Sequence, residues 1–180
     1  MNARAIRHEV HRLKAKYKTD DPYEICDAMD ITVSKKMMGR HEGSCKGFFI
    51  NNSRCKTIVI NDAQPALIQR IILVHELGHA VLHAGSTKVS AFHDTAVLDN
   101  TDCLEYEANV FSAEFLLDDD EVLDLLKSGY SYFEVARNNC VPSELLDFKL
   151  QIMRSRGYDL IPPYLARGDY LKRDLGGSDY

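Results

Sequence analysis

Residues 71–83 read I-I-L-V-H-E-L-G-H-A-V-L-H, an apolar stretch of helical character that carries two histidines four residues apart. Residues at this spacing lie on one face of a helix, so the imidazoles of His75 and His79 converge on a single point. Glu76 adjoins that point and can reach a water molecule held there. The stretch therefore predicts a buried helix with two metal ligands and a general base, and the alternative is a core helix with two satisfied histidines.

A zinc hydrolase needs three protein ligands, with a water molecule in the fourth position. The metzincin pattern, which would supply a third histidine, is not met, because Leu82 stands at its glycine position. His83 follows His79 by one turn, and an unbroken helix cannot direct three successive turns at one ion. We therefore expect His83 to pack against the site or to support it, and we expect a glutamate from a later helix as the third ligand.

Residues 101–117 form that later helix, with apolar side chains at helical spacing and two candidate glutamates. Glu105 is favoured because Asn109, one turn later, can hold a ligand histidine in one tautomer. The small Ala108 also allows this helix to approach the motif helix. Glu107 has more apolar neighbours and is the alternative third ligand.

Three segments together resemble the ImmA/IrrE family of metallopeptidases: T-I-V-I-N at 57–61, H-E-L-G-H-A-V-L-H at 75–83 and E-Y-E-A-N-V-F-S-A-E-F-L-L at 105–117. The resemblance implies a Zn²⁺-dependent endopeptidase in which Glu105 is the third ligand. It also implies an unusual substrate, a helix-turn-helix transcriptional repressor. Cleavage of that repressor would derepress genes of a mobile element or prophage.

The expected chemistry assigns roles to several further residues. Glu76 takes a proton from the attacking water and passes it to the leaving amine. His83 and His93 are candidates for a second electrophile. Residues 58–60 directly precede the motif helix, and they are either an edge strand that pairs with extended substrate or a buried core strand.

Bulk properties narrow the class of protein. The net charge is −5, which argues against direct nucleic-acid binding because phosphate contacts need clustered Lys and Arg. The five cysteines are an odd number without a C-x-x-C pair, which indicates free thiols in a reducing compartment. No signal peptide and no apolar run long enough to span a membrane are present, so a cytoplasmic protein is expected.

The pattern along the chain predicts an α+β fold, with a small β-sheet packed against helices and a gluzincin-like zinc site between two helices. Two units are expected: a zinc metallopeptidase domain over 1–127 and a helical C-terminal subdomain with a tail over 128–180. Helices at 131–138 and 142–156 resemble a helix-turn-helix pair. The second of them has Lys149 as its only basic residue in the first two turns, so packing or substrate docking is favoured over DNA reading.

Predicted helices cover 2–17, 22–29, 64–83, 103–117 and 118–127, and predicted strands cover 31–33, 47–50 and 57–60, with loops at 34–46 and 84–100.

Two rival functions remain. The chain could be a zinc-binding regulator that acts by protein–protein contact, or a DNA-binding regulator without proteolysis. The set of His75, Glu76, His79 and a glutamate favours catalysis, because a purely structural zinc site has no need of Glu76.

Overall fold

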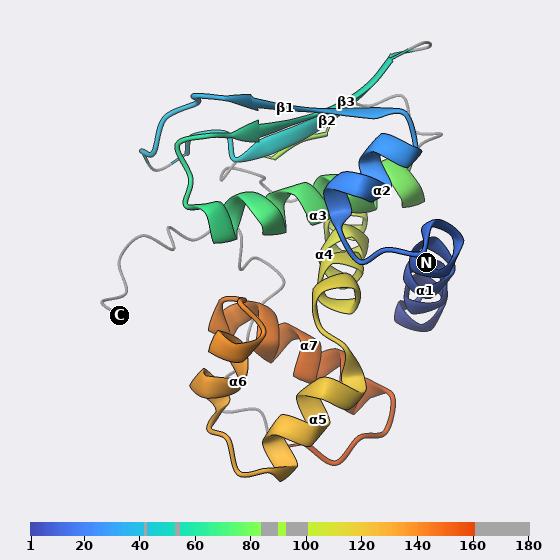
Figure 1. Cartoon of the computed structure of the whole chain (residues 1–180), viewed down its shortest axis with the longest axis vertical. Helices are drawn as coiled ribbons and strands as arrows, with labels where there is room; N and C mark the ends of the chain where they lie inside the picture. The colour runs from blue at the N-terminus through green and yellow to red at the C-terminus, as the bar shows by residue number, and fades with distance from the viewer. Residues whose placement is uncertain (42, 53–54, 84–89, 93–100, 161–180) are drawn as a thin grey trace.

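Four strands form one mixed sheet, and the helices lie on one side of it (Figure 1). The computed structural model describes residues 1–41, 43–52, 55–83, 90–92 and 101–160. Its elements, in chain order, are α1 (Ala3–Tyr17), α2 (Pro22–Ala28), β1 (Ile31–Lys36), β2 (Gly47–Asn52), β3 (Cys55–Asn61), α3 (Ala66–Leu82), β4 (Ser90–Phe92), α4 (Thr101–Leu116), α5 (Asp119–Lys127), α6 (Tyr132–Asn138) and α7 (Ser143–Ser155). The predicted α+β class is confirmed.

The strand order is β1-β3-β2-β4, with β1 parallel to β3 and the other pairs antiparallel. Ile58 of β3 stands between Val33 of β1 and Phe49 of β2. The expectation that residues 58–60 form an edge strand is therefore wrong, and their alternative reading as a buried core strand holds. Ile58 and Ile60 are completely buried, and the edges of the described sheet are β1 and β4.

Two predicted loops contain strand residues. β1 continues to Lys36, because its last residues pair with the end of β3, and β4 lies inside the predicted 84–100 loop. Both strands depend on partners that are distant in sequence, which local patterns do not reveal. The remaining predicted elements lie within three residues of the observed bounds.

α3 is the centre of the fold. One side contacts β2 and β3, the other contacts α4, and most of its apolar residues, among them Ile71, Leu73 and Leu77, are almost completely buried. A helix that is apolar around most of its circumference must be covered on several sides. Burying each such side chain contributes about 1.5–3 kcal/mol, so the helix that carries the motif is also the main source of core stability.

α4 crosses α3 and extends away from the sheet towards α7, with α1 packed along its side (Figure 1). A buried group of charged side chains ties these helices together; we call it the α7 ion-pair cluster. Lys149 of α7 contacts Glu114 of α4 and Asp119 of α5, both at 2.8 Å. Arg156 pairs with the same two carboxylates, and Arg7 of α1 lies 2.9 Å from Asp119.

This cluster crosses the predicted unit boundary after residue 127, and that division of the chain stays a prediction.

The five cysteines are free thiols, as predicted. Among the described residues, no helix combines the length and the apolar character that crossing a membrane requires.

Candidate metal centre

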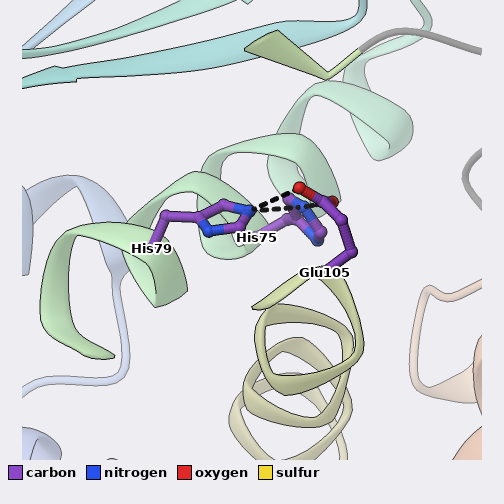
Figure 2. A group of neighbouring side chains, drawn as sticks. All are labelled: His75, His79 and Glu105. Carbon is purple, nitrogen blue, oxygen red and sulfur yellow. Dashed lines mark hydrogen bonds and ion pairs between the residues drawn. The ribbon is translucent and has the colours of Figure 1, made fainter. Parts of the chain in front are cut away.

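α3 directs two histidines at the same point, as their spacing predicts (Figure 2). The Nε2 atoms of His75 and His79 lie 3.2 Å apart, and both side chains are buried. The contact between two imidazole nitrogens in a buried site contributes little stability by itself. Such a pair is typical of ligands that share an ion.

α4 brings a carboxylate to these two nitrogens (Figure 2). Glu105 Oε2 lies 3.2 Å from His75 Nε2, and Glu105 Oε1 lies 3.4 Å from His79 Nε2. The ligand atoms of His75, His79 and Glu105 all fall within 4.8 Å of one another, so this group could hold a metal ion. The predicted trio thus comes together in the fold, on two helices that are distant in sequence.

The distances around this point are of the size that ligand atoms have around a metal ion such as zinc. In a tetrahedral site with bonds of about 2.0–2.1 Å, ligand atoms are separated by about 3.3 Å. The two Nε2 atoms are 3.2 Å apart, and each lies near one oxygen of the Glu105 carboxylate, 3.2 Å for His75 to Oε2 and 3.4 Å for His79 to Oε1, so each contact is close to this value. The donor set of two imidazoles and one carboxylate is also the one that leaves a fourth position for water.

The charge states of Glu105 and His75 suit metal binding. Burial acts to raise the pKa of Glu105, but hydrogen bonds to His75 and His79 outweigh it and hold that pKa well below its usual range. Burial also lowers the pKa of His75. For His79, burial acts in the same direction, but the carboxylates of Glu105 and Glu76 outweigh it and raise its pKa. An ionised Glu105 beside a neutral His75 is the form in which these groups coordinate a metal.

Glu76 lies beside this trio in a buried position. Neither of its carboxylate oxygens meets hydrogen-bond geometry with any residue that the structure describes. Burial raises the pKa of Glu76 to about 8; the positive character of His79 opposes the rise, and the charge of Glu105 adds to it. The backbone of Phe49 opposes the rise in pKa least of these groups. A buried carboxylate with so little hydrogen bonding is costly, and its position beside candidate metal ligands suggests a chemical role.

Two glycines let other elements approach α3 at the site. A Cβ on Gly78 would lie 3.1–3.2 Å from atoms of Phe111, so this glycine permits the close contact of α3 with α4. A Cβ on Gly47 of β2 would collide with Ile72 and would lie 3.7 Å from Glu76 Cγ. The sequence analysis did not single out Gly47. Its place at the start of a predicted strand could have identified it, because a glycine in a strand often marks a site where another part of the protein lies close to the backbone.

Asn61, the last residue of the T-I-V-I-N segment, has a structural role that the sequence did not reveal. Its side-chain oxygen accepts hydrogen bonds from the backbone amides of Met38 and Ala63, both at 3.0 Å. Its side-chain nitrogen donates to the carbonyls of Gly39 at 2.7 Å and Cys45 at 2.9 Å. Asn61 is completely buried and so holds the segment before β2, and with it Gly47, against the start of α3.

The alternative third ligand, Glu107, lies elsewhere. Its Oε2 is 3.0 Å from His83 Nε2, and its Oε1 contacts the amino group of Met1. His83 in turn approaches the opposite side of the His79 ring, with 3.1 Å between the two Nδ1 atoms. His83 therefore faces away from the point between the three candidate ligands, which argues against its use as a second electrophile. His93, the other candidate, lies outside the described residues.

Asn109 lies near His75, as predicted, and its side chain acts to raise the pKa of that histidine against the larger effect of burial. His83 is neutral near pH 7: burial and the charge of His79 lower its pKa to about 4. Each candidate histidine ligand thus has a polar side chain next to it, Asn109 beside His75 and His83 beside His79.

An H-E-x-x-H helix that faces a glutamate from a second helix is typical of metallopeptidases. The family model described as the IrrE N-terminal-like domain, a peptidase family, matches residues 26–151 of the chain. Uncharacterized immunity region protein 2 of Bacillus phage phi105 is 35% identical over 144 residues, which are 80% of this chain and 88% of the relative. Metallopeptidase ImmA of Bacillus subtilis (strain 168) is 28% identical over 150 residues, which are 82% of this chain and 85% of the relative. The chain belongs to the ImmA/IrrE family of metallopeptidases, as its motifs suggested.

Proposed function

We propose that the protein is a zinc-dependent endopeptidase that uses His75, His79 and Glu105 as metal ligands and Glu76 as general base. The observation that carries the proposal is the meeting of His75, His79 and the Glu105 carboxylate at one point, with 3.2 Å between the two Nε2 atoms and 3.2–3.4 Å from each to one carboxylate oxygen. Membership in a metallopeptidase family supports it independently. A zinc site with a purely structural role gives no reason for the carboxylate of Glu76 to be buried beside the ligands.

The residues divide the chemistry between them. When bound, a zinc ion polarises the scissile carbonyl, lowers the pKa of its water and opposes by its charge the effect of burial on the pKa of Glu76. Glu76 accepts a proton from the attacking water and passes it to the amine nitrogen of the leaving peptide. The packing of α3 against β2 and α4 holds Glu76 and the ligands in fixed positions, which keeps the proton acceptor within reach.

We further propose that the substrate is a helix-turn-helix transcriptional repressor in the cytoplasm, cut at one exposed segment so that phage or mobile-element genes are derepressed. The family and a relative named for a phage immunity region support this substrate. The C-terminal helices fit protein docking better than DNA binding. Tyr130 and Phe133, beside and on α6, are 45% and 55% exposed, whereas Lys149 of α7 is buried in ion pairs and cannot meet a phosphate.

Co-expression tests this proposal directly. The protein, as wild type or as Glu76→Gln, is produced together with the repressor encoded beside its gene, and the repressor is followed by mass spectrometry. We expect one discrete cut with wild type and none with Glu76→Gln, because an amide cannot accept the proton of the attacking water. Glu121→Gln, an exposed position on α5, is the matched control and should cleave normally.

Two outcomes would contradict the proposal. Cleavage at the wild-type rate by purified, zinc-loaded Glu76→Gln removes Glu76 as the base. An intact repressor that is nevertheless inactivated by wild type and by Glu76→Gln alike indicates a regulator that acts by protein–protein contact.

A further inference from the structure

His79 is contacted at both of its ring nitrogens. Its Nε2 faces Glu105 Oε1 at 3.4 Å and His75 Nε2 at 3.2 Å. Its Nδ1 lies 3.1 Å from Nδ1 of His83. The two nitrogens of an imidazole point in different directions, so one faces the candidate metal position and the other faces His83.

The contact with His83 continues to α4. His83 Nε2 lies 3.0 Å from Oε2 of Glu107, and the side chains of His83 and Glu107 are only 7% and 15% exposed. The other oxygen of Glu107 contacts the amino group of Met1. A row of side chains therefore runs from the candidate metal position through His79 and His83 to a carboxylate that belongs to the same helix as Glu105.

Only one arrangement of protons satisfies this row. A neutral histidine that binds a metal through Nε2 carries its proton on Nδ1. The Nδ1–H of His79 then donates to Nδ1 of His83, which must be unprotonated. His83 accordingly carries its proton on Nε2 and donates it to Glu107 Oε2. Each hydrogen bond has one donor and one acceptor, and reversing either of them would leave two lone pairs or two protons face to face.

We propose that His83 and Glu107 are positioning residues of the metal centre, which fix the tautomer and ring orientation of His79 through successive hydrogen bonds. This inference rests on the proposed function, because it takes His79 as a metal ligand through Nε2. Hydrogen bonds of this kind also raise the basicity of a ligand imidazole. Glu107, the residue that competed with Glu105 for the role of third ligand, thus serves the site indirectly.

Zinc affinity of the full chain, measured by competition with a chromophoric chelator, tests the inference without any substrate. His83→Leu keeps a side chain of similar bulk but removes the acceptor, and we expect zinc affinity to fall about 10–100-fold. His83→Gln should restore part of the loss, because its amide oxygen can accept from His79 and its amide nitrogen can donate to Glu107. Glu107→Ala should weaken binding less than His83→Leu does.

A double variant separates positioning from simple packing. If Glu107 acts through His83, the His83→Leu/Glu107→Ala protein binds zinc as tightly as His83→Leu alone. Nuclear magnetic resonance of the zinc-loaded protein adds a direct signature. The Nδ1–H proton of His79 should be protected from exchange in wild type and in His83→Gln, and lost in His83→Leu. His11→Leu, an exposed histidine on α1, is the matched control and should change neither readout.

The inference is overturned if folded His83→Leu binds zinc as tightly as wild type, or if the losses of the two single variants add in the double variant. It is also overturned if His83→Gln binds as weakly as His83→Leu. If His83→Leu fails to fold, the zinc affinities of Glu107→Ala and His83→Gln still test the inference. If the variants change zinc affinity as expected but wild type does not cleave the repressor, only the proposed substrate is contradicted. If wild type cleaves the repressor but the zinc affinity does not depend on His83, only this inference is contradicted.

Discussion

Lys149 Nζ lies 2.8 Å from Glu114 Oε2, although both side chains are only 1% exposed. The pair joins α7 to α4, the helix that carries Glu105 nearer its start. Buried charges of this kind are tolerated only when they are paired, and here Asp119, Arg156 and Arg7 complete the neutralisation. The position of the C-terminal helices relative to the candidate metal centre therefore depends on a small number of charged residues.

Lys149→Met should destabilise the protein strongly. The substitution preserves much of the side-chain volume but removes one cation, and the carboxylates of Glu114 and Asp119 stay buried with less compensation. We expect the free energy of unfolding in urea to fall by about 3–5 kcal/mol. Lys127→Met, at an exposed position on α5, is the control and should change it by less than about 0.5 kcal/mol. Equal stability of the two variants would falsify this account of the cluster.

Acid should weaken the same cluster. Burial acts to raise the pKa of Asp119, but the charges of Lys149, Arg156 and Arg7 outweigh it and lower that pKa below its ordinary 3.8. A carboxylate with a depressed folded pKa contributes stability that is fully present above its unfolded pKa and is lost as the pH falls through the folded value. We therefore expect the contribution of Asp119 to decline only below about pH 4.

Unfolding titrations from about pH 3 to about pH 6 measure this contribution. Asp119→Asn should be less stable than wild type at the upper end of the range, and the difference should shrink towards the lower end. A constant difference across the range would show that the Asp119 charge does not contribute in this way.

Glu105 and Glu107 should differ in zinc stoichiometry. Glu105→Ala removes an oxygen that lies 3.2 Å from His75 Nε2, and we expect most of the bound zinc to be lost to a competing chelator. Glu107→Ala leaves the three candidate ligands intact, so one zinc per chain should remain once zinc is saturating, even if affinity is reduced. Metal analysis after gel filtration reports both values, and the opposite ranking would make Glu107 the ligand.

Gly78→Ala should damage both stability and metal binding. The added methyl group would meet Phe111 at 3.1–3.2 Å, which forces α3 and α4 apart. Overpacking costs about 1–3 kcal/mol, and this outweighs the gain of about 1 kcal/mol or less from better helix propensity. Because Glu105 lies on α4, zinc affinity should fall as well. A variant with wild-type affinity and wild-type thermal stability would show that the helices can adjust.

Tyr130 and Phe133 should matter for a folded repressor but not for zinc. Changing both to Ser removes two exposed aromatic side chains, and we expect repressor cleavage to slow at least about tenfold while zinc affinity stays unchanged. Tyr23→Ser, an exposed aromatic residue on α2, is the control. Equal cleavage by all three proteins would remove the docking role of this surface.

These point substitutions are preferable to deletion of residues 128–180. The deletion would also remove Lys149 and Arg156, and it would leave Glu114 and Asp119 without their main partners. A loss of cleavage in the truncated chain would then follow from instability as readily as from the loss of a docking surface.

The local sequence was sufficient to predict the features that depend on the periodicity of a single helix. The four-residue step between His75 and His79 fixes their common face through helix geometry alone, and the apolar patterns located α3 and α4 closely. The chemistry of the trio and the family could be read from the same short segments. Each of these conclusions depends on neighbours within a few residues, so no knowledge of distant contacts was needed.

Only the tertiary structure decided which side chains from different elements meet. Glu105 and Glu107 are two residues apart and so point about 200° apart around α4, and the packing of Phe111 on Gly78 decides which one faces α3. The internal position of β3 depends on its parallel pairing with β1, and the burial of Lys149 depends on α1, α4 and α5. These outcomes are sums of many contacts between residues far apart in the chain, which is why no local pattern contains them.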